Sequence, residues 1–350
     1  MFLFVVISLR IAAKIIHFIK NYRHVFIQVL YKKQKIHWND CCSVSPEAKM
    51  EKPNHYIVQR TLARPVTLSG HGLHTGIPSS VTICPAPSDH GIVFSRSDIG
   101  VTIKADHQHV DLSGSTLSTV LTNKNGSVRT VEHVLSALIG MEINNAIIEV
   151  LGEEIPIMDG SSSPFVNAIL NVGLKEQTLK TPVFFVTRPV EYKSGDKTFM
   201  AVPGSSFKID YFVDFGNSFR QQYSMVVSPH SYRMEVARAK TFCSAADLEK
   251  IRSAGLAKGG TRKNALIVGP DRILNPESQS YPDELVRHKI LDFIGDMGLA
   301  EGRILGSFTV SKGGHRFHIE CLKEMIKDRV LELREEPKKY GVLDLAFQDL

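Results

Sequence analysis

The order of apolar and polar positions predicts two runs of short strands, each followed by helices. From about residue 57 to residue 152, alternating apolar residues bounded by Gly, Pro or Ser predict strands. Apolar residues at helical spacing predict helices over 129–141 and 163–174. Strands return after residue 182, and helices follow at 283–298 and 316–336.

Strands that precede helices in each half indicate an α+β fold, with two layers of similar build. The polar stretch 175–182, which ends at a proline, is interpreted as the linker between the halves. We therefore expect three parts: an N-terminal extension at 1–49, a first α+β domain at 50–179 and a second at 180–350.

Residues 1–49 differ from the rest of the chain in charge. The formal net charge is +6, but the first acidic residue is Asp40 and seven basic residues precede it. Without this leader the chain is nearly neutral, so its charge gives no support for nucleic-acid binding. The leader's apolar, basic composition fits a transit peptide or a basic amphipathic helix, and its apolar runs are too short for a membrane span.

The alternative that we favour for the leader is a natural start of translation at Met50. That start predicts a cytoplasmic protein, whereas a genuine transit peptide would predict a mitochondrial one. The five cysteines are scattered and show no CxxC spacing. They predict a reducing compartment, without a disulfide framework or a cysteine zinc site.

A histidine and two aspartates share one stripe of the helix predicted at 283–298. His288, Asp292 and Asp296 follow one another at intervals of four, so they project from the same face. A His–Asp pair at this spacing can hold a metal ion, but taken alone it is more simply a solvated face. The same caution applies to Asp159, for which a capped turn is the better interpretation.

Two other stretches supply partners for this stripe. Glu132 and His133 begin the first predicted helix, with Thr130 as the expected N-cap. Adjacent helical side chains point about 100° apart, so one can bind a metal while the other reaches a water. His315 follows two glycines, whose turn can present an imidazole into a cleft, and it is favoured over His318 for that reason.

Two histidines and one carboxylate make the ligand count of a catalytic zinc site. The expected ligands are His133, His288 and Asp292. Glu132 would be the general base, His315 a second acid–base group, and Asp296 a carboxylate that orients an imidazole and raises its pKa. No HExxH motif is present, which disfavours zincin proteases, and the glycine motifs of nucleotide hydrolysis and dinucleotide binding are absent.

Six stretches together resemble the bacterial UDP-3-O-acyl-N-acetylglucosamine deacetylases. They are "GHGLHTG" (70–76), "TVEH" (130–133), "IPIMDGSSSPF" (155–165), "ARAKTF" (237–242), "VRHKILDFIGD" (286–296) and "SKGGH" (311–315). Each is weak alone, but all six occur in the family's order and spacing, from about Gln59 to about residue 345. The resemblance implies two similar α+β domains, each pairing a sheet with two helices, with the active site between them.

The resemblance also implies a zinc amidase that removes the N-acetyl group of an acylated UDP-sugar, the committed step of lipid A synthesis. It gives the ligands, base and acid the roles stated above, and adds Thr241 as a donor to the oxyanion. Further expected substrate contacts are Phe242 at the acyl passage, Lys289 at the diphosphate or sugar, and Asp214 and Phe215 at uridine. An acyl chain requires an apolar passage, and the segment 245–260, with Leu248 and Gly260, is its candidate wall.

The expected partner is thus a small-molecule substrate, and no nucleic acid is expected. The protein itself is expected to associate transiently with a membrane surface. The expected assembly is a monomer. One rival is a non-catalytic homologue that binds the nucleotide sugar, but every expected catalytic residue is present. Another is a membrane-surface protein built around the leader. The sequence leaves open whether His315 or Glu132 returns the proton to the leaving amine.

Overall fold

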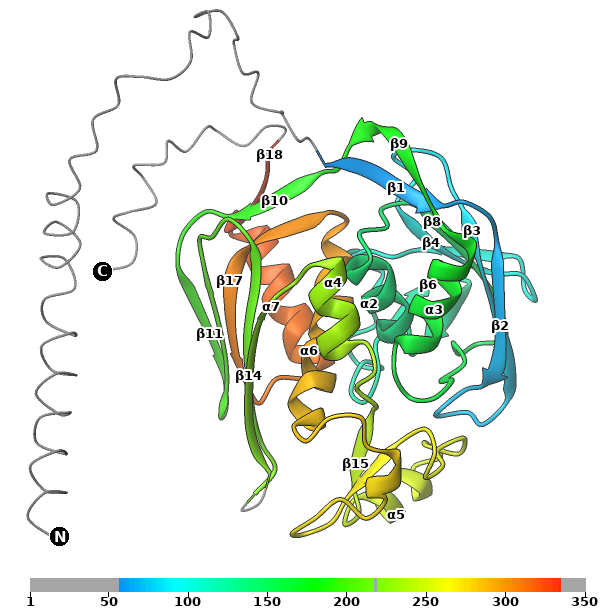
Figure 1. Ribbon diagram of the computed structural model, residues 1–350, viewed down its shortest axis with the longest axis vertical. Helices are drawn as coiled ribbons and strands as arrows, with labels where there is room; N and C mark the ends of the chain where they lie inside the picture. The colour runs from blue at the N-terminus through cyan, green and yellow to red at the C-terminus, as the bar shows by residue number, and fades with distance from the viewer. Residues whose placement is uncertain (1–56, 217–218, 335–350) are drawn as a thin grey trace, which may run out of the picture. The chain divides into compact units, whose positions relative to one another are not determined.

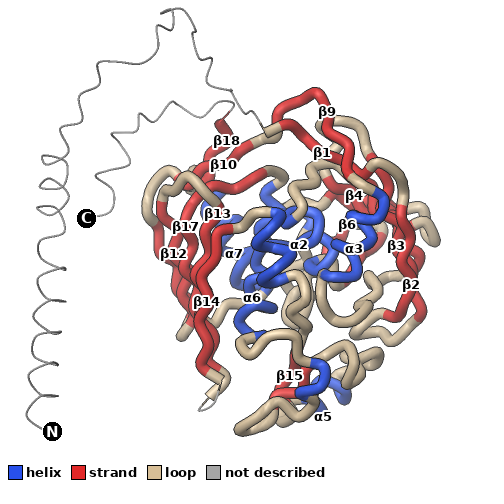
Figure 2. Tube along the Cα trace, viewed as in Figure 1, coloured by secondary structure: helices blue, strands red, loops and turns tan. Residues whose placement is uncertain are grey.

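The computed structural model describes residues 57–216 and 219–334, so the expected extension at 1–49 lies outside the described residues. Two main sheets face each other with the longer helices between them (Figures 1 and 2). This arrangement confirms the α+β fold predicted from the strand and helix pattern. The domain boundary near residue 180 stays a prediction. None of the helices in the described ranges combines the length and apolarity that crossing a bilayer requires.

The first sheet has five strands in the order β2-β3-β8-β4-β5. Their bounds are β2 Val66–His71, β3 Pro78–Pro85, β4 Ile92–Arg96, β5 Val101–Lys104 and β8 Ala146–Leu151. Residues at alternate positions of β3, such as Val81 and Ile83, are fully buried, which is the period-two pattern of a sheet with one covered face. Helices α2 (Glu132–Gly140) and α3 (Ser163–Val172) belong to this half.

The second sheet centres on β17 (Arg303–Ser311), which pairs antiparallel with β12 and parallel with β13 and β10. The other strands are β10 Val183–Val186, β11 Val190–Ser194, β12 Lys197–Val202, β13 Phe207–Asp214, β14 Arg220–Val226 and β18 Leu331–Arg334. Helices α6 (Glu284–Met297) and α7 (His315–Lys327) belong to this half. Each half therefore pairs one sheet with two helices.

Shorter elements join and extend these layers. They are β1 Val58–Leu62, β6 Val120–Asn123, β7 Gly126–Arg129, β9 Leu174–Lys180, β15 Phe242–Ser244, β16 Leu266–Val268, α4 Pro229–Ser231, α5 Leu248–Ser253 and the short helical turns η1 His107–His109, η2 Tyr232–Val236, η3 Pro276–Ser278 and η4 Gly298–Ala300. The pair β15 and β16 and helix α5 project from one end of the molecule (Figure 1).

The stretch 175–182 is mostly a strand rather than the expected linker. It forms most of β9, which pairs antiparallel with β1 and places Arg60 opposite Glu176, whose side chains form an ion pair at 3.2 Å. Most side chains of β9 are exposed, so its polar composition reflects exposure and not the absence of regular structure. Composition alone could not distinguish an exposed strand from an irregular linker.

Two helix ends also differ from the prediction. Val131, and not Thr130, is the N-cap of α2, and it makes no side-chain capping hydrogen bond. Thr130 has a φ of 60° and its hydroxyl donates to Glu154 at 2.9 Å, so a tertiary contact takes this side chain. The C-terminal helix ends at Lys327, and β18 follows, pairing with β10.

Helices α2 and α6 cross at a glycine. A Cβ atom at Gly295 would collide with the backbone oxygen of Glu132, so only glycine permits this close approach. On its other side, α6 buries Phe293 completely against the rings of Phe199 and Phe308. The crossing and this aromatic core place the start of α2 beside the middle of α6, where the polar side chains of the candidate site lie.

Candidate metal centre and its surroundings

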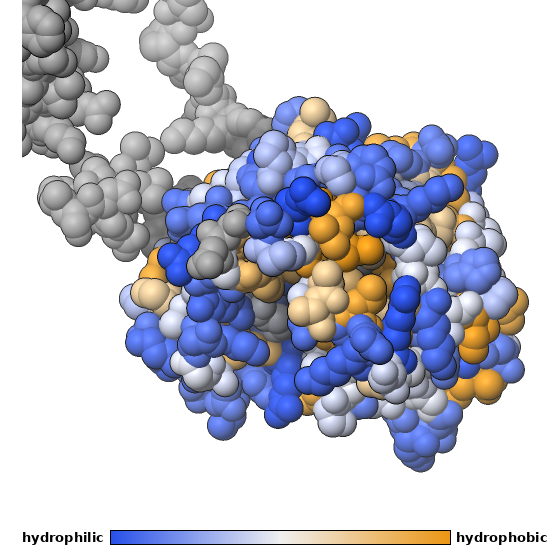
Figure 3. Space-filling view, turned by 90° about the horizontal axis from the view of Figure 1, so that it is seen from below, coloured by the Kyte–Doolittle hydropathy of each residue, from blue (hydrophilic) through white to orange (hydrophobic). Residues whose placement is uncertain are grey.

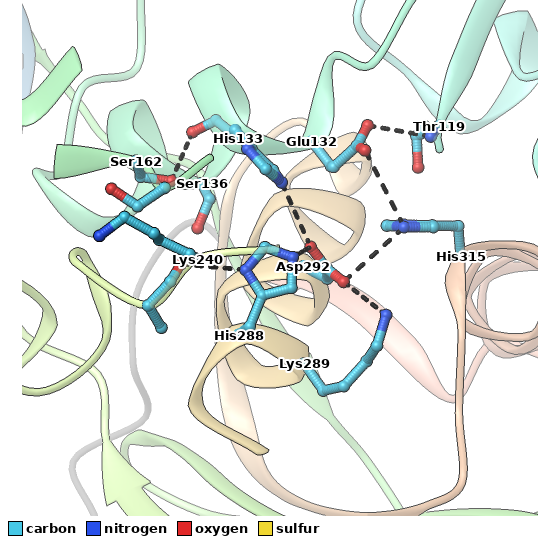
Figure 4. A network of polar contacts seen from close by, with 12 residues as sticks. Thr119, Glu132, His133, Ser136, Ser162, Lys240, His288, Lys289, Asp292 and His315 are labelled. Atoms are coloured by element: carbon cyan, nitrogen blue, oxygen red, sulfur yellow. Dashed lines mark hydrogen bonds and ion pairs between the residues drawn. The ribbon is translucent and has the colours of Figure 1, made fainter. Parts of the chain in front are cut away.

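Two histidines and an aspartate meet where α2 and α6 cross. His133 Nε2 lies 3.7 Å from Asp292 Oδ1, and His288 Nε2 lies 3.3 Å from the same oxygen. The three potential ligand atoms lie within 4.8 Å of one another, and all three residues are buried. Figure 4 shows both imidazoles directed at Asp292. This is the trio of ligands expected from the sequence.

The hydrogen bonds of these residues favour ligation of a cation. His288 Nδ1 donates to the backbone oxygen of Ala239 at 3.0 Å, which leaves Nε2 as the nitrogen with a free lone pair. Asp292 Oδ1 is buried and has no hydrogen-bond partner among the described residues. A buried carboxylate oxygen without a partner is costly unless something positive binds it, so the trio fits a divalent metal ion.

Protonation in this pocket follows from burial. Burial lowers the pKa of His133 to about 3 and that of His288 to about 4, so both are neutral at pH 7 and able to bind a metal. Burial alone would raise the pKa of Asp292, but His288, Lys289 and His315 hold it far below its usual value. Lys289 contributes directly, because its ammonium donates to Asp292 Oδ2 at 2.8 Å.

Glu132 is the first residue of α2 and lies beside the trio. Its Oε2 accepts the backbone N–H of Thr119 at 2.9 Å, and its Oε1 lies 3.9 Å from His315 Nε2. Burial raises the pKa of Glu132 to about 7, and Asp292 and Asp296 add to that rise. A carboxylate with a pKa near neutrality is suited to accepting and returning a proton.

His315 begins α7, directly after the strand β17 and its glycine turn, as expected. Its Nδ1 lies 3.0 Å from Asp296 Oδ2, so the predicted pair of imidazole and carboxylate forms. Burial lowers the pKa of His315, but the charges of Asp296, Asp292 and Glu132 outweigh it and raise the value to about 9. The imidazole is therefore protonated at neutral pH and can act as an acid.

A second imidazole binds the same carboxylate. His318 Nδ1 lies 2.8 Å from Asp296 Oδ2, and its Nε2 lies 2.8 Å from the hydroxyl of Tyr211. Burial lowers the pKa of His318, so it is neutral. A neutral imidazole that donates from Nδ1 to Asp296 must accept from Tyr211 at Nε2. The sequence pattern favours His315 over His318 and indicates no role for His318. In the structure His318 supports the site by binding Asp296 and Tyr211.

An apolar cavity of about 140 Å³ is lined by Thr241, Phe242, Leu248 and Gly260, together with residues of the first half such as Leu73 and Leu117. Its wall continues to the candidate centre, because the ring of Phe242 lies 5.9 Å from that of His288. Seen from the end that carries α5, hydrophobic residues gather within a hydrophilic frame (Figure 3). The lining of this cavity is thus mostly apolar and reaches the surroundings of His288.

The remaining expected contacts lie near Phe242. The ring of Phe215, which is 49 % exposed, lies 5.1 Å from that of Phe242, and the ammonium of Lys289 lies 5.4 Å from the same ring. Asp214 pairs with Arg220 and Lys312 at the end of β13. Asp159 accepts from the backbone and hydroxyl of Ser161, so it forms the capped turn expected from the sequence.

Two buried side chains at the site had no assigned role in the sequence. His74 lines the cavity, and neither of its ring nitrogens has a hydrogen-bond partner among the described residues. Thr119 lies beside Glu132 (Figure 4). His74 sits in the recognised "GHGLHTG" stretch, which could have indicated it, whereas nothing in the sequence around Thr119 marks it.

A second cavity, of about 180 Å³, lies away from the candidate ligands. It is lined by Ile139, Gly140 and Met297 at the C-terminal ends of α2 and α6, whereas Glu132 and His133 begin α2. This cavity is larger than the first, but none of its lining residues belongs to the histidine–aspartate trio.

Comparison with known proteins gives a consistent result. The family model for UDP-3-O-acyl N-acetylglycosamine deacetylases matches residues 59–327. A UDP-3-O-acyl-N-acetylglucosamine deacetylase of Anaeromyxobacter sp. (strain Fw109-5) is 42% identical over 275 residues, which cover 78% of this chain and 90% of the relative. A protein of the same name from Saccharophagus degradans is 41% identical over 275 residues, covering 77% of this chain and 91% of its own.

Proposed function

The chain belongs to the UDP-3-O-acyl-N-acetylglucosamine deacetylase family, and from this premise we propose that it is a zinc-dependent amidohydrolase. It removes the N-acetyl group of a UDP-3-O-acyl-N-acetylglucosamine, giving the free amine and acetate, as the committed step of lipid A synthesis. The observation that carries the zinc proposal is the buried trio His133, His288 and Asp292, with an unpartnered carboxylate oxygen at its centre. When bound there, zinc would supply Lewis-acid chemistry, polarising a carbonyl and making a water acidic near pH 7.

The chain's own residues divide the remaining work. Glu132 takes the proton of the attacking water, because its carboxylate is buried beside the trio and its pKa lies near neutrality. The hydroxyl of Thr241 donates to the oxyanion that develops on the acetyl group. The leaving amine needs a proton, and His315, protonated at neutral pH, is one source. Glu132, with the proton it has accepted, is the other.

We propose that the acyl chain of the substrate occupies the cavity of about 140 Å³, between Phe242 and the wall formed by Leu248 and Gly260. Lys289 would meet the diphosphate or sugar, because its ammonium lies between the trio and the ring of Phe242. Asp214 and the half-exposed Phe215 would contact uridine. In these assignments the acyl chain lies in the apolar cavity, and the polar part of the substrate lies near Lys289, Asp214 and Phe215.

One chain supplies the trio, Glu132 and His315, so the site needs no residue from a second copy, and we propose a monomer as the active species. We place the reaction in the cytoplasm, because the substrate is a nucleotide sugar, and propose a transient association with a membrane surface because that substrate carries an acyl chain. A genuine transit peptide in residues 1–49 would instead direct the protein to mitochondria. Mass spectrometry of the mature N-terminus separates the two locations.

Two variants test the proposed function. His133→Ala removes one ligand, so the purified protein should lose its bound zinc, measured by elemental analysis, together with its deacetylase activity. Glu132→Ala should keep about one zinc per chain and lose at least ~10²-fold in rate, the usual scale for a general base. Undiminished zinc in the first variant, or near-normal turnover in the second, would refute the assignments. An unmodified protein that binds the UDP-sugar without hydrolysing it would establish the non-catalytic alternative.

A further inference from the structure

Glu132 and Asp296 belong to different helices, yet both lie beside the imidazole of His315. Glu132 begins α2 in the first half, and Asp296 lies near the end of α6 in the second. His315 stands between them, with Nε2 3.9 Å from Glu132 Oε1 and Nδ1 3.0 Å from Asp296 Oδ2. Glu132 directs Oε1 at the imidazole, whereas both oxygens of Asp296 lie near Nδ1, Oδ2 at 3.0 Å and Oδ1 at 3.3 Å.

One residue, Thr119, donates a hydrogen bond to both carboxylates. The backbone N–H of Thr119 donates to Glu132 Oε2 at 2.9 Å, and its hydroxyl donates to Asp296 Oδ1 at 2.6 Å. Its backbone oxygen accepts the N–H of Val131 at 3.3 Å, directly before α2. Thr119 is fully buried, so water does not compete for these hydrogen bonds.

These contacts close a ring of four groups. It runs from the Thr119 amide to Glu132, from Glu132 to His315, from His315 to Asp296, and from Asp296 to the Thr119 hydroxyl. A carboxylate free to rotate about its last bond would not keep one oxygen on the imidazole. Thr119 holds Glu132 at the oxygen that does not face His315. At Asp296 the Thr119 hydroxyl binds Oδ1 while His318 binds Oδ2 at 2.8 Å, and together they fix the orientation of this carboxylate.

We propose that Thr119 is a positioning residue for the deacetylation, and that its hydroxyl acts through Asp296 to fix His315 opposite Glu132. The proposal rests on the proposed function, because it assigns Thr119 to the same proton-transfer groups. It predicts that the hydroxyl matters for turnover far more than for substrate binding, since Thr119 does not line the cavity that we assign to the acyl chain.

The test uses the zinc-loaded full chain and measures kcat and KM of deacetylation. Thr119→Val keeps the shape and the backbone amide but removes the hydroxyl. We expect kcat to fall ~10-fold or more, the usual scale for a residue that orients a catalytic group, with KM within ~2-fold. Thr119→Ser restores the donor and should recover kcat to within ~3-fold of the unmodified protein. Thr122→Val is the matched control, because within residues 57–216 and 219–334 that hydroxyl donates only to backbone oxygens, and its kcat should be unchanged.

A double-mutant cycle separates positioning from a merely structural role. If the hydroxyl acts through Asp296, Thr119→Val should cost less than ~2-fold in kcat when Asp296 is already Asn. Thr119→Ala gives a second hydroxyl-free variant if the valine protein does not fold, and the same cycle applies to it. An unchanged kcat in the hydroxyl-free variants, no recovery with serine, or an equal cost in both backgrounds would each overturn the proposal. An unmodified protein without activity would instead refute the proposed function.

Discussion

The charge of Asp296 should set the pH range in which the enzyme works, and Asp296→Asn tests this directly. The substitution removes a buried negative charge 3.0 Å from His315 Nδ1 while keeping the size of the side chain. Asp296 makes the largest of the contributions that raise the pKa of His315. It also helps to raise the pKa of Glu132. Both proton-transfer groups therefore respond to one substitution.

The structure gives the sign and scale of the response. The rise of the His315 pKa from 6.5 to about 9 corresponds to ~3 kcal/mol in favour of the imidazolium. Without the charge of Asp296, burial opposes the imidazolium more effectively, so the pKa of His315 falls. Glu132 loses a neighbouring negative charge, so its pKa falls as well.

The proposed mechanism uses ionised Glu132 as the base, and protonated His315 on the route in which His315 supplies the proton to the amine. On that route kcat/KM should rise through the pKa of Glu132 and fall through that of His315. Both limbs should move to lower pH in Asp296→Asn, and the alkaline limb by at least ~1 pH unit. A bound cation lowers both pKa values in the unmodified protein and the variant alike, so the comparison between them keeps its direction.

The assay is kcat/KM for deacetylation between pH 5.5 and 10, with zinc content and thermal unfolding measured in parallel. Asp210→Asn is the control, because its carboxylate binds only the side chain of Gln222 among the described residues and lies on β13. Its profile should match that of the unmodified protein. An alkaline limb of Asp296→Asn at the unmodified position, or at higher pH, would show that Asp296 does not control the protonation of His315.

Three further outcomes follow from the packing. Glu154→Gln should lower the free energy of unfolding in urea by ~1–3 kcal/mol, because this buried carboxylate accepts four hydrogen bonds from residues 74, 75 and 130. Leu248→Trp should raise KM for a long-chain substrate at least ~10-fold and leave a short-chain analogue unaffected, measured by steady-state kinetics, because it fills the proposed acyl cavity. Phe293→Ala should lower the free energy of unfolding by ~3–5 kcal/mol, measured in urea, because its fully buried ring packs against four aromatic side chains of the second half and His318.

Regular periodicity made the helices of the site predictable. The four-residue interval between His288 and Asp292 required only that 283–298 be a helix, and α6 satisfies it. The strands of both sheets were predictable for the same reason, since alternate positions are buried. Prediction failed at β9, where the side chains are mostly exposed, and at Thr130, whose hydroxyl binds Glu154 instead of capping α2.

The supporting residues could not be predicted in this way. Thr119 precedes β6 in an irregular stretch, and its two carboxylate partners lie 13 and 177 positions further along the chain. The link from His318 to Tyr211 likewise spans 107 positions. The contact between Thr119 and Asp296 depends on how the two halves meet, and that between His318 and Tyr211 depends on how α7 packs on β13. No local pattern in a single sequence indicates either contact.

The charge balance of the site explains why a glutamate with a raised pKa can serve as the base. Asp292 and Asp296 are ionised in the buried site, and His315 and Lys289 offset their two charges. Glu132 would add a third buried negative charge, and burial resists it by raising the pKa to about 7. A cation held by the trio supplies the missing positive charge, so Glu132 should then be ionised at neutral pH. Without a cation, a pKa of about 7 leaves Glu132 only partly ionised at neutral pH. A bound cation favours the ionised form, which is the form that accepts a proton from water.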